Sequence, residues 1–100
     1  MYKLIARKNV KKFINKRNEK EKETIKKKLK LLKENPYPDN AFLDIKKLKN
    51  LPFYRLRINN YRIIYEIIEN EVVILLLEAD KRGDIYWWKK RKRRFYKEKL

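Results

Sequence analysis

Apolar residues recur along this chain with two spacings, one typical of helices and one typical of strands. Two stripes have the i, i+3, i+4 spacing of amphipathic helices: Val10, Phe13 and Ile14, then Ile25, Leu29 and Leu32. Asn18 is suited to cap the second helix, with Glu19 and Glu21 in its first turn. That helix should end at Asn35, because the residue before a proline disfavours helical backbone. We therefore expect two helices whose narrow apolar stripes pack on a sheet.

Strand-like patterns make up most of the remaining chain. Four segments show them: residues 2–6, 53–58, 61–68 and 71–79. Asn59 and Asn60 fit a two-residue hairpin turn with positive φ, and Glu69 and Asn70 indicate a second hairpin. Residues 35–52 hold two proline turns and should form a long connection. The order β-α-α-β-β-β predicts an α+β domain, with the helical hairpin on one face of an antiparallel sheet.

Three arginines interrupt the apolar alternation of the second and third predicted strands. Arg55 and Arg57 lie on the face opposite Leu56, because successive strand side chains point to opposite faces. Arg62 lies on the face opposite Tyr61 in the next strand. A tight hairpin between the two strands then brings the three guanidinium groups together, on the face that the helices leave open.

The expected arginine cluster requires negative charge, since guanidinium groups on neighbouring strands repel one another. Glu66 and Glu78, on adjacent predicted strands, would supply it as an ion-pair lattice. Two carboxylates do not balance three arginines, whereas a bound phosphate matches the planar fork of arginine. The pattern therefore favours a phosphate-binding face.

The amino-acid composition excludes several kinds of catalytic and metal site and indicates the class of binding partner. The 100 residues include no cysteine and no histidine, which excludes disulfides, thiolate zinc sites and Ser-His catalysis. The formal net charge is +17 and is not confined to one end of the chain. Such a charge favours nucleic acid as a partner, the alternative being a solvated lysine-rich surface.

Hydrophobic runs in the chain are short. The longest, "VVILLL" at residues 72–77, suits a buried strand and is too short to cross a membrane. The first residues, "MYKLIARKNV", lack the hydrophobic region of a signal peptide. We therefore expect a single small cytoplasmic domain with no membrane partner.

The chain beyond the last predicted strand adds more basic and aromatic residues. Gly83 permits a turn that folds Arg82 and Tyr86 back over the arginine cluster. Tyr86 would then stack on a nucleobase, the alternative being a cap on the core. We expect a domain of residues 1–86, followed by a basic segment of residues 87–100 that is helical in some contexts.

Several stretches of the chain resemble the RelE/ParE superfamily of toxins from type II toxin–antitoxin systems. They are "KLKNLPFYRLRINNYRIIYEI", "VVILLLEADKR" and "DIY", preceded by the strand and the helical hairpin. The resemblance covers nearly the whole chain and implies the RelE-like microbial RNase fold. RelE-like members enter the ribosomal A site and cut mRNA, whereas ParE-like members share the fold and act on DNA gyrase.

The resemblance also implies a set of active residues. The positions that match the RelE-type set are Arg55, Arg57, Arg62, Arg82 and Tyr86. All five hold basic or phenolic groups, which favours the RNase branch. RelE-like nucleases often have lysine where this chain has Arg55 and Arg57. An arginine is always charged and is poorly suited to abstract a proton.

Together these observations predict a metal-independent endoribonuclease without a cofactor, in which the 2′-hydroxyl of the RNA attacks the adjacent phosphate. Arg57 and Arg62 would stabilise the phosphorane, and Arg55 would hold the phosphate. Arg82 would protonate, or donate a hydrogen bond to, the leaving 5′ oxygen. The general base would be Tyr86, its pKa lowered by nearby arginines.

Glu66 and Glu78 are the alternative general bases if Tyr86 only stacks. The resemblance implies two partners: the ribosome with its mRNA, and a cognate antitoxin that forms a heteromeric complex with the toxin. Two other functions stay open, a ParE-like inhibitor of DNA gyrase and a nucleic-acid-binding module without catalysis.

Overall fold

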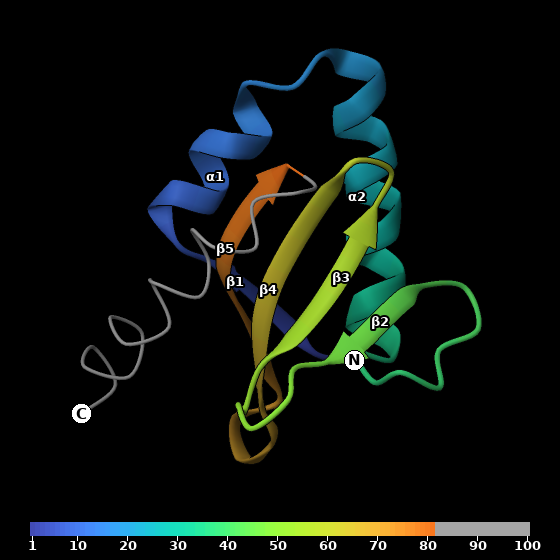
Figure 1. Ribbon diagram of the computed structural model, residues 1–100, viewed down its shortest axis with the longest axis vertical. Coiled ribbons are helices and arrows are strands. Elements are labelled where there is room, and N and C mark those ends of the chain that lie inside the picture. Colours follow the sequence, from blue (N-terminus) through green and yellow to red (C-terminus); the bar gives the residue numbers. More distant parts are fainter. Residues whose placement is uncertain (82–100) are drawn as a thin grey trace.

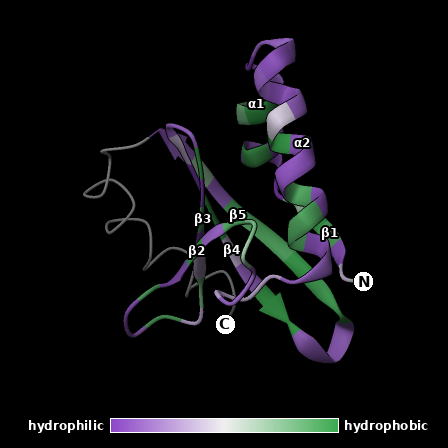
Figure 2. Ribbon diagram, turned by 90° about the vertical axis from the view of Figure 1, so that its right-hand side faces the viewer, coloured by the Kyte–Doolittle hydropathy of each residue, from purple (hydrophilic) through white to green (hydrophobic). Residues whose placement is uncertain are grey.

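The structure, a computed structural model, describes residues 1–81 of the chain. The predictions for Arg82, Tyr86 and residues 87–100 lie outside the described residues. The elements in chain order are β1 (Lys3–Ala6), α1 (Lys8–Asn15), α2 (Glu19–Glu34), β2 (Asp44–Lys47), β3 (Tyr54–Ile58), β4 (Tyr61–Ile68), the 3-10 turn η1 (Glu69–Glu71) and β5 (Val73–Lys81). The two helices form one layer and the sheet forms the other (Figures 1 and 2).

The sheet has five strands in the order β1-β5-β4-β3-β2. The predicted α+β architecture with a helical hairpin on one face is confirmed, but the sheet is mixed rather than wholly antiparallel. β1 pairs with β5 in parallel, with Lys3 opposite Val73. The hairpin of α1 and α2 is part of the crossover between β1 and the rest of the sheet, and such a crossover is what a parallel pair needs.

β2 lies in the segment that the sequence pattern predicted to be a connection. It is a short edge strand that pairs antiparallel with β3 and places Ile45 opposite Leu56. Ile45 is buried, whereas Asp44 and Lys46 on either side of it are exposed. One buried residue is too weak a pattern to mark a strand, so the pairing with β3 decides this element.

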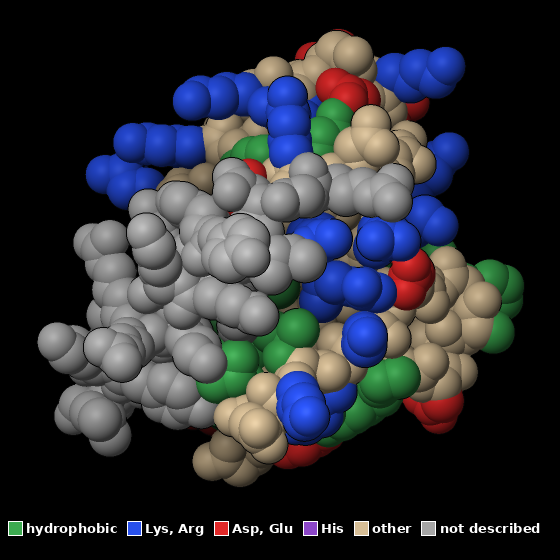
Figure 3. Space-filling model, in the orientation of Figure 1, with side chains coloured by type: hydrophobic (Ala, Val, Ile, Leu, Met, Phe, Trp, Pro, Cys, Tyr) green, Lys and Arg blue, Asp and Glu red, His purple; other side chains and the backbone are tan. Residues whose placement is uncertain are grey.

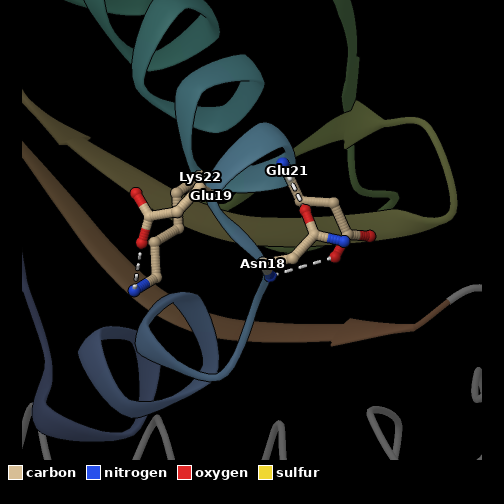
Figure 4. A network of polar contacts seen from close by, with 4 residues as sticks. All are labelled: Asn18, Glu19, Glu21 and Lys22. Atoms are coloured by element: carbon tan, nitrogen blue, oxygen red, sulfur yellow. Dashed lines mark hydrogen bonds and ion pairs between the residues drawn. The ribbon is translucent and has the colours of Figure 1, made fainter.

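The helix α2 begins as predicted at Asn18, which forms a complete capping box with Glu21 (Figure 4). The Asn18 Oδ1 accepts from the Glu21 N–H at 2.8 Å, and the Glu21 Oε1 accepts from the Asn18 N–H at 3.3 Å. Glu19 pairs with Lys22 at 3.7 Å in the same turn. These contacts satisfy two amide groups that the first turn of a helix leaves without partners. α2 ends before Pro36, with Asn35 in extended backbone, as predicted.

The main core lies between the helices and the sheet. Its buried members are Val10, Ile25, Leu32, Ile45, Leu56, Ile58, Tyr61, Ile63, Tyr65, Ile74, Leu76 and Ala79. A second, smaller cluster contains Leu51, Phe53, Ile64 and Leu77. Ile64 and Leu77 bring this cluster to the opposite face of the sheet. No helix among residues 1–81 is long and apolar enough to span a membrane.

The two turns between the last three strands differ from each other. Asn59 has a φ of 51°, and the β3–β4 hairpin closes with Ile58 opposite Tyr61, as predicted. The turn between β4 and β5 is longer than a tight hairpin, because η1 precedes Val72, whose φ is 54°. A β-bulge in the β4–β5 pairing lies next to Ile64. A bulge changes which face of the sheet the following side chains point to, and here Leu77 is the extra residue of β5.

A group of tyrosines packs on the helix side of the sheet. The rings of Tyr54 and Tyr65 stack with centroids 5.7 Å apart, and Tyr37 meets Tyr54 edge-on at 5.9 Å. The buried Tyr65 hydroxyl donates a 2.6 Å hydrogen bond to the carbonyl of Pro36. Burial raises the pKa of Tyr65, so this hydroxyl remains a donor at physiological pH. The bond fixes the end of α2 to the centre of the sheet.

Glu69 extends this group at the turn between β4 and β5. The hydroxyls of Tyr2 and Tyr37 both donate hydrogen bonds to its carboxylate. These hydrogen bonds hold the pKa of Glu69 below its usual range, and the bond from Tyr37 has the larger effect. The same bonds raise the pKa of both tyrosines. The carboxylate therefore joins the N-terminus, the segment after α2 and the β4–β5 turn.

Candidate active site

The three arginines that interrupt the strand pattern lie on the sheet face away from the helices. Arg57 and Arg62 are direct cross-strand partners on β3 and β4, and Arg55 lies opposite Ile64. Figure 3 views this face and shows lysine and arginine side chains gathered over its middle. We call the surface formed by Arg55, Arg57 and Arg62 the arginine face.

The side chains of the arginine face are largely, but not fully, removed from solvent. The Nε atom of each of the three arginines is buried and makes no hydrogen bond in the structure. The side chain of Arg55 is 17% exposed, and Arg57 and Arg62 are of intermediate exposure. A guanidinium that is partly removed from water interacts more strongly with any charge placed beside it. The arrangement therefore combines three fixed positive charges with unused hydrogen-bond donors.

One acidic side chain partly balances this charge. The carboxylate of Asp44 accepts a 2.8 Å hydrogen bond from Arg55 and forms an ion pair with it. Asp80 is the register partner of Arg62 on β5, but within residues 1–81 the ion pair of Arg55 with Asp44 is the one that involves these three arginines. Like charges directly opposite each other on paired strands destabilise a sheet, so the pairing of Arg57 with Arg62 favours a bound anion.

Among the ion pairs within residues 1–81, none joins Glu66 or Glu78 to these three arginines. Glu66 and Glu78 are both buried, and Glu78 accepts a 2.8 Å hydrogen bond from the Asn9 amide of α1. Asn9 also donates to the carbonyl of Leu77, beside the bulge. Glu78 therefore helps to fix α1 against β5.

Sequence reasoning missed two charged residues beside the arginine face because it missed β2. Asp44 lies opposite Arg57, and Lys46 lies opposite Arg55 in the β2–β3 register. The signal was present as a charged residue on each side of the apolar Ile45. Arg82 and Tyr86, the other two candidates, lie outside the described residues, so their relation to this face stays a prediction. Residues 1–81 contain no group of three or more acidic side chains that could hold a metal ion.

Comparison with protein families identifies the fold and its relatives. Residues 2–86 match the family of the ParE toxin of the type II toxin–antitoxin system parDE. The chain belongs to this family. It is thus a member of the RelE/ParE toxin superfamily, as its resemblance indicated. No curated protein matched the chain.

Solved structures of RelE toxins share this fold. The intact E. coli RelBE toxin–antitoxin complex matches with 26% identity and a TM-score of 0.69, covering 83% of this chain and 99% of that chain. The isolated E. coli RelE toxin matches with 25% identity and a TM-score of 0.69, covering 92% and 98%. The archaeal RelE–RelB complex from Pyrococcus horikoshii, at 24% identity, has a TM-score of 0.72 over 83% and 97%. In fold, this chain is close to the RelE-like toxins.

Proposed function

We propose that this toxin is a ribosome-dependent endoribonuclease that cleaves mRNA in the ribosomal A site. The observation that supports this most strongly is the direct pairing of Arg57 with Arg62 on β3 and β4, which the single register partner Asp80 on β5 does not balance in charge. Two positive groups held together in this way match the negative charge of a phosphodiester. The likeness to RelE toxin structures supports the same reading.

The proposed reaction begins with attack of an RNA 2′-hydroxyl on the neighbouring phosphorus. The 2′ oxygen forms a bond to phosphorus, the bond to the 5′ oxygen breaks, and the products are a 2′,3′-cyclic phosphate and a 5′-hydroxyl. The phosphorane carries more negative charge than the substrate, so prepositioned cations lower the barrier. Arg57 and Arg62 are proposed to stabilise it. Arg55 is proposed to hold the phosphate, because its ion pair with Asp44 fixes its orientation.

Two proton transfers accompany this reaction. The 2′-hydroxyl must lose a proton and the 5′ oxygen must gain one. A guanidinium stays charged at physiological pH, so Arg55 and Arg57 are unsuited to take the first proton. Glu66 and Glu78 are buried, which leaves Tyr86 as the proposed base. Arg82 is proposed to donate a hydrogen bond to the leaving 5′ oxygen, and the proton taken up by the base returns to that oxygen directly or through water. This limited acid–base set fits an enzyme whose ribosome partner helps to align the RNA for in-line attack.

A cognate antitoxin is the second proposed partner. The structures of RelE from E. coli and from P. horikoshii include complexes with RelB, and this chain shares their fold. We infer that an antitoxin binds this toxin in a heteromeric complex and blocks the arginine face or displaces residues 87–100. Co-expression with the neighbouring open reading frame, followed by co-purification, tests this partner.

Mapping of cleaved ends in a translating extract tests the proposed activity. Wild-type toxin should cut mRNA only when ribosomes translate it, and Arg62→Ala should remove the cuts. Lys30→Ala removes one positive charge from an exposed position of α2 and should leave cleavage unchanged. Intact transcripts with the wild type, at concentrations that arrest growth, would contradict the proposal.

A second candidate function rests on the family match. The matching family is that of the ParE toxin, so inhibition of DNA gyrase is the alternative. It predicts loss of supercoiling activity in a purified gyrase assay, with Arg62→Ala as active as the wild type. RNA binding without either effect would instead identify a module without catalysis.

A further inference from the structure

Arg17 follows α1 and packs on two aromatic rings at the end of the sheet. Its guanidinium carbon lies 4.4 Å from the centroid of Phe13 and 5.3 Å from that of Tyr61. The two rings themselves meet edge to face, with centroids 5.5 Å apart. Stacking of this kind holds a guanidinium in one place without using its N–H donors.

The hydrogen-bonding capacity of Arg17 remains unused in the part of the chain that the structure describes. Its Nε is buried without a hydrogen bond, and none of the carboxylates of residues 1–81 pairs with its guanidinium. Glu19, the nearest acidic residue in sequence, is paired with Lys22 instead. A cation–π contact explains why the side chain is held here, but it leaves the charge and the donors without an anionic partner.

Arg17 lies where β4 begins, next to one end of the arginine face. Its platform, Tyr61, directly precedes Arg62 on β4, and the two side chains point to opposite faces of the sheet. Lys81 on β5 is the register partner of Tyr61 and is exposed. Arg62 on one face of the sheet and Arg17, with Lys81, on the other therefore lie at the same end of β4.

We propose that Arg17 binds a backbone phosphate of RNA that continues past the arginine face around the end of β4. Arginine suits this role because its fork can donate two hydrogen bonds to one phosphate. The stacking on Phe13 and Tyr61 orders the side chain beforehand, so less conformational entropy is lost on binding. Arg17 is thus a positioning residue outside the reacting centre. The inference rests on the proposed function, since it extends the path of the same RNA.

The salt dependence of RNA binding tests this role directly. The full-length toxin is titrated with a short single-stranded 2′-O-methyl RNA, which lacks the attacking hydroxyl, between about 50 and 200 mM salt. Arg17→Gln should reduce the slope of log affinity against log salt by about 0.7, the value for one phosphate contact on a single strand. Affinity at near-physiological salt should fall roughly fourfold. Arg17→Lys should keep most of the slope and lose part of the affinity, because the charge remains without the fork.

Two controls separate this contact from folding and from net charge. Lys30→Gln makes the same change in charge at an exposed position of α2 and should leave the slope unaltered. Thermal unfolding of each variant measures the stability that the stacked guanidinium provides. A lower melting temperature for Arg17→Gln with an unchanged slope would assign Arg17 to stability alone and overturn the inference.

The phosphate can belong to mRNA or to ribosomal RNA, and a second titration distinguishes the two. Loss of affinity for the isolated oligonucleotide places the contact on the substrate strand. Loss of affinity for vacant ribosomes alone, by the same variant, would place the contact on ribosomal RNA and overturn its assignment to the strand that passes the arginine face. If Arg17→Gln behaves like Lys30→Gln in both titrations, the inference is overturned. Cleavage of mRNA by the wild type would in that case still support the proposed function. A wild type that binds neither RNA nor ribosomes contradicts both.

Discussion

The two faces of β3 and β4 carry side chains of opposite character on the same short strands. Leu56 and Ile63 point toward the helices and are fully buried in the main core. Arg55, Arg57 and Arg62 point the other way and are only partly exposed, with buried Nε atoms that make no hydrogen bond within residues 1–81. The difference follows from the layers, because the two helices cover only one face of the sheet (Figure 2).

This contrast teaches how a small domain can hold a cluster of like charges. The helix side supplies the burial that stabilises the chain, so the other side can tolerate repulsion between Arg57 and Arg62. Substitutions on the helix side should therefore affect mainly stability, and substitutions on the arginine face should affect mainly the proposed activity. Substitutions on the two faces, taken from the largest expected effect to the smallest, test how complete that separation is.

Truncation of one side chain on each face has the largest expected effect. Leu56→Ala creates a cavity in the main core and should lower the free energy of unfolding by about 2–5 kcal/mol, measured by urea denaturation. Arg57→Ala removes a repulsive neighbour of Arg62 and should change stability by less than about 1 kcal/mol. Its cleavage of mRNA should fall by roughly two to three orders of magnitude. Equal destabilisation by both variants would show that the faces are not separable.

Removal of the Tyr65 hydroxyl sharpens the comparison on the helix side. Tyr65→Phe leaves the Pro36 carbonyl without its buried donor and should cost about 1–2 kcal/mol of unfolding free energy. Tyr54→Phe is the matched control, since the Tyr54 hydroxyl forms no hydrogen bond within residues 1–81. Both variants should keep wild-type cleavage. The prediction fails if the two substitutions cost the same.

Loss of the ion pair on the arginine face should have a small effect on stability. Asp44→Asn breaks the contact with Arg55, but the Asp44 side chain is 55% exposed and the pair is screened by water. The free energy of unfolding should therefore change by less than about 1 kcal/mol. Chemical denaturation measures it, and a loss of several kcal/mol would show that Asp44 is a structural element of the sheet.

The hydrogen bonds from Tyr2 and Tyr37 to Glu69 should make the stability of the protein depend on pH in acid. The pKa of Glu69 is lower in the folded state than its usual value of 4.5, so its contribution is complete above that value. It is lost as the pH falls through the folded pKa and the carboxylate takes up a proton. The stability difference between wild type and Glu69→Gln should be constant near neutrality and shrink in acid. A difference that grows in acid would contradict this assignment.

Much of the fold follows from local patterns that can be seen in the sequence. The strand over 61–68 and the hairpin at Asn59 follow from alternation and from a turn residue that tolerates positive φ. The start of α2 follows from the capping box of Asn18 and Glu21. Each of these signals involves residues close together in the chain, so no knowledge of distant partners is needed.

Other features depend on partners that are far apart in the sequence. β2 has one buried residue, Ile45, and becomes a strand only because β3 pairs with it. The parallel pairing of β1 with β5 joins residues about 70 positions apart and has no local signature. The ion pair of Arg55 with Asp44 depends on β2 and was missed with it.

The sequence by itself determined that three arginines share one face of a β-hairpin, because side chains of a strand alternate with a period of two. It also determined the chemistry available, since a chain without histidine or cysteine that carries a net charge of +17 favours phosphate. Only the tertiary structure decided which carboxylate meets these arginines and that Arg17 stacks on Tyr61. Those contacts join separate elements, and the packing of helices and strands, rather than local backbone preference, brings them together.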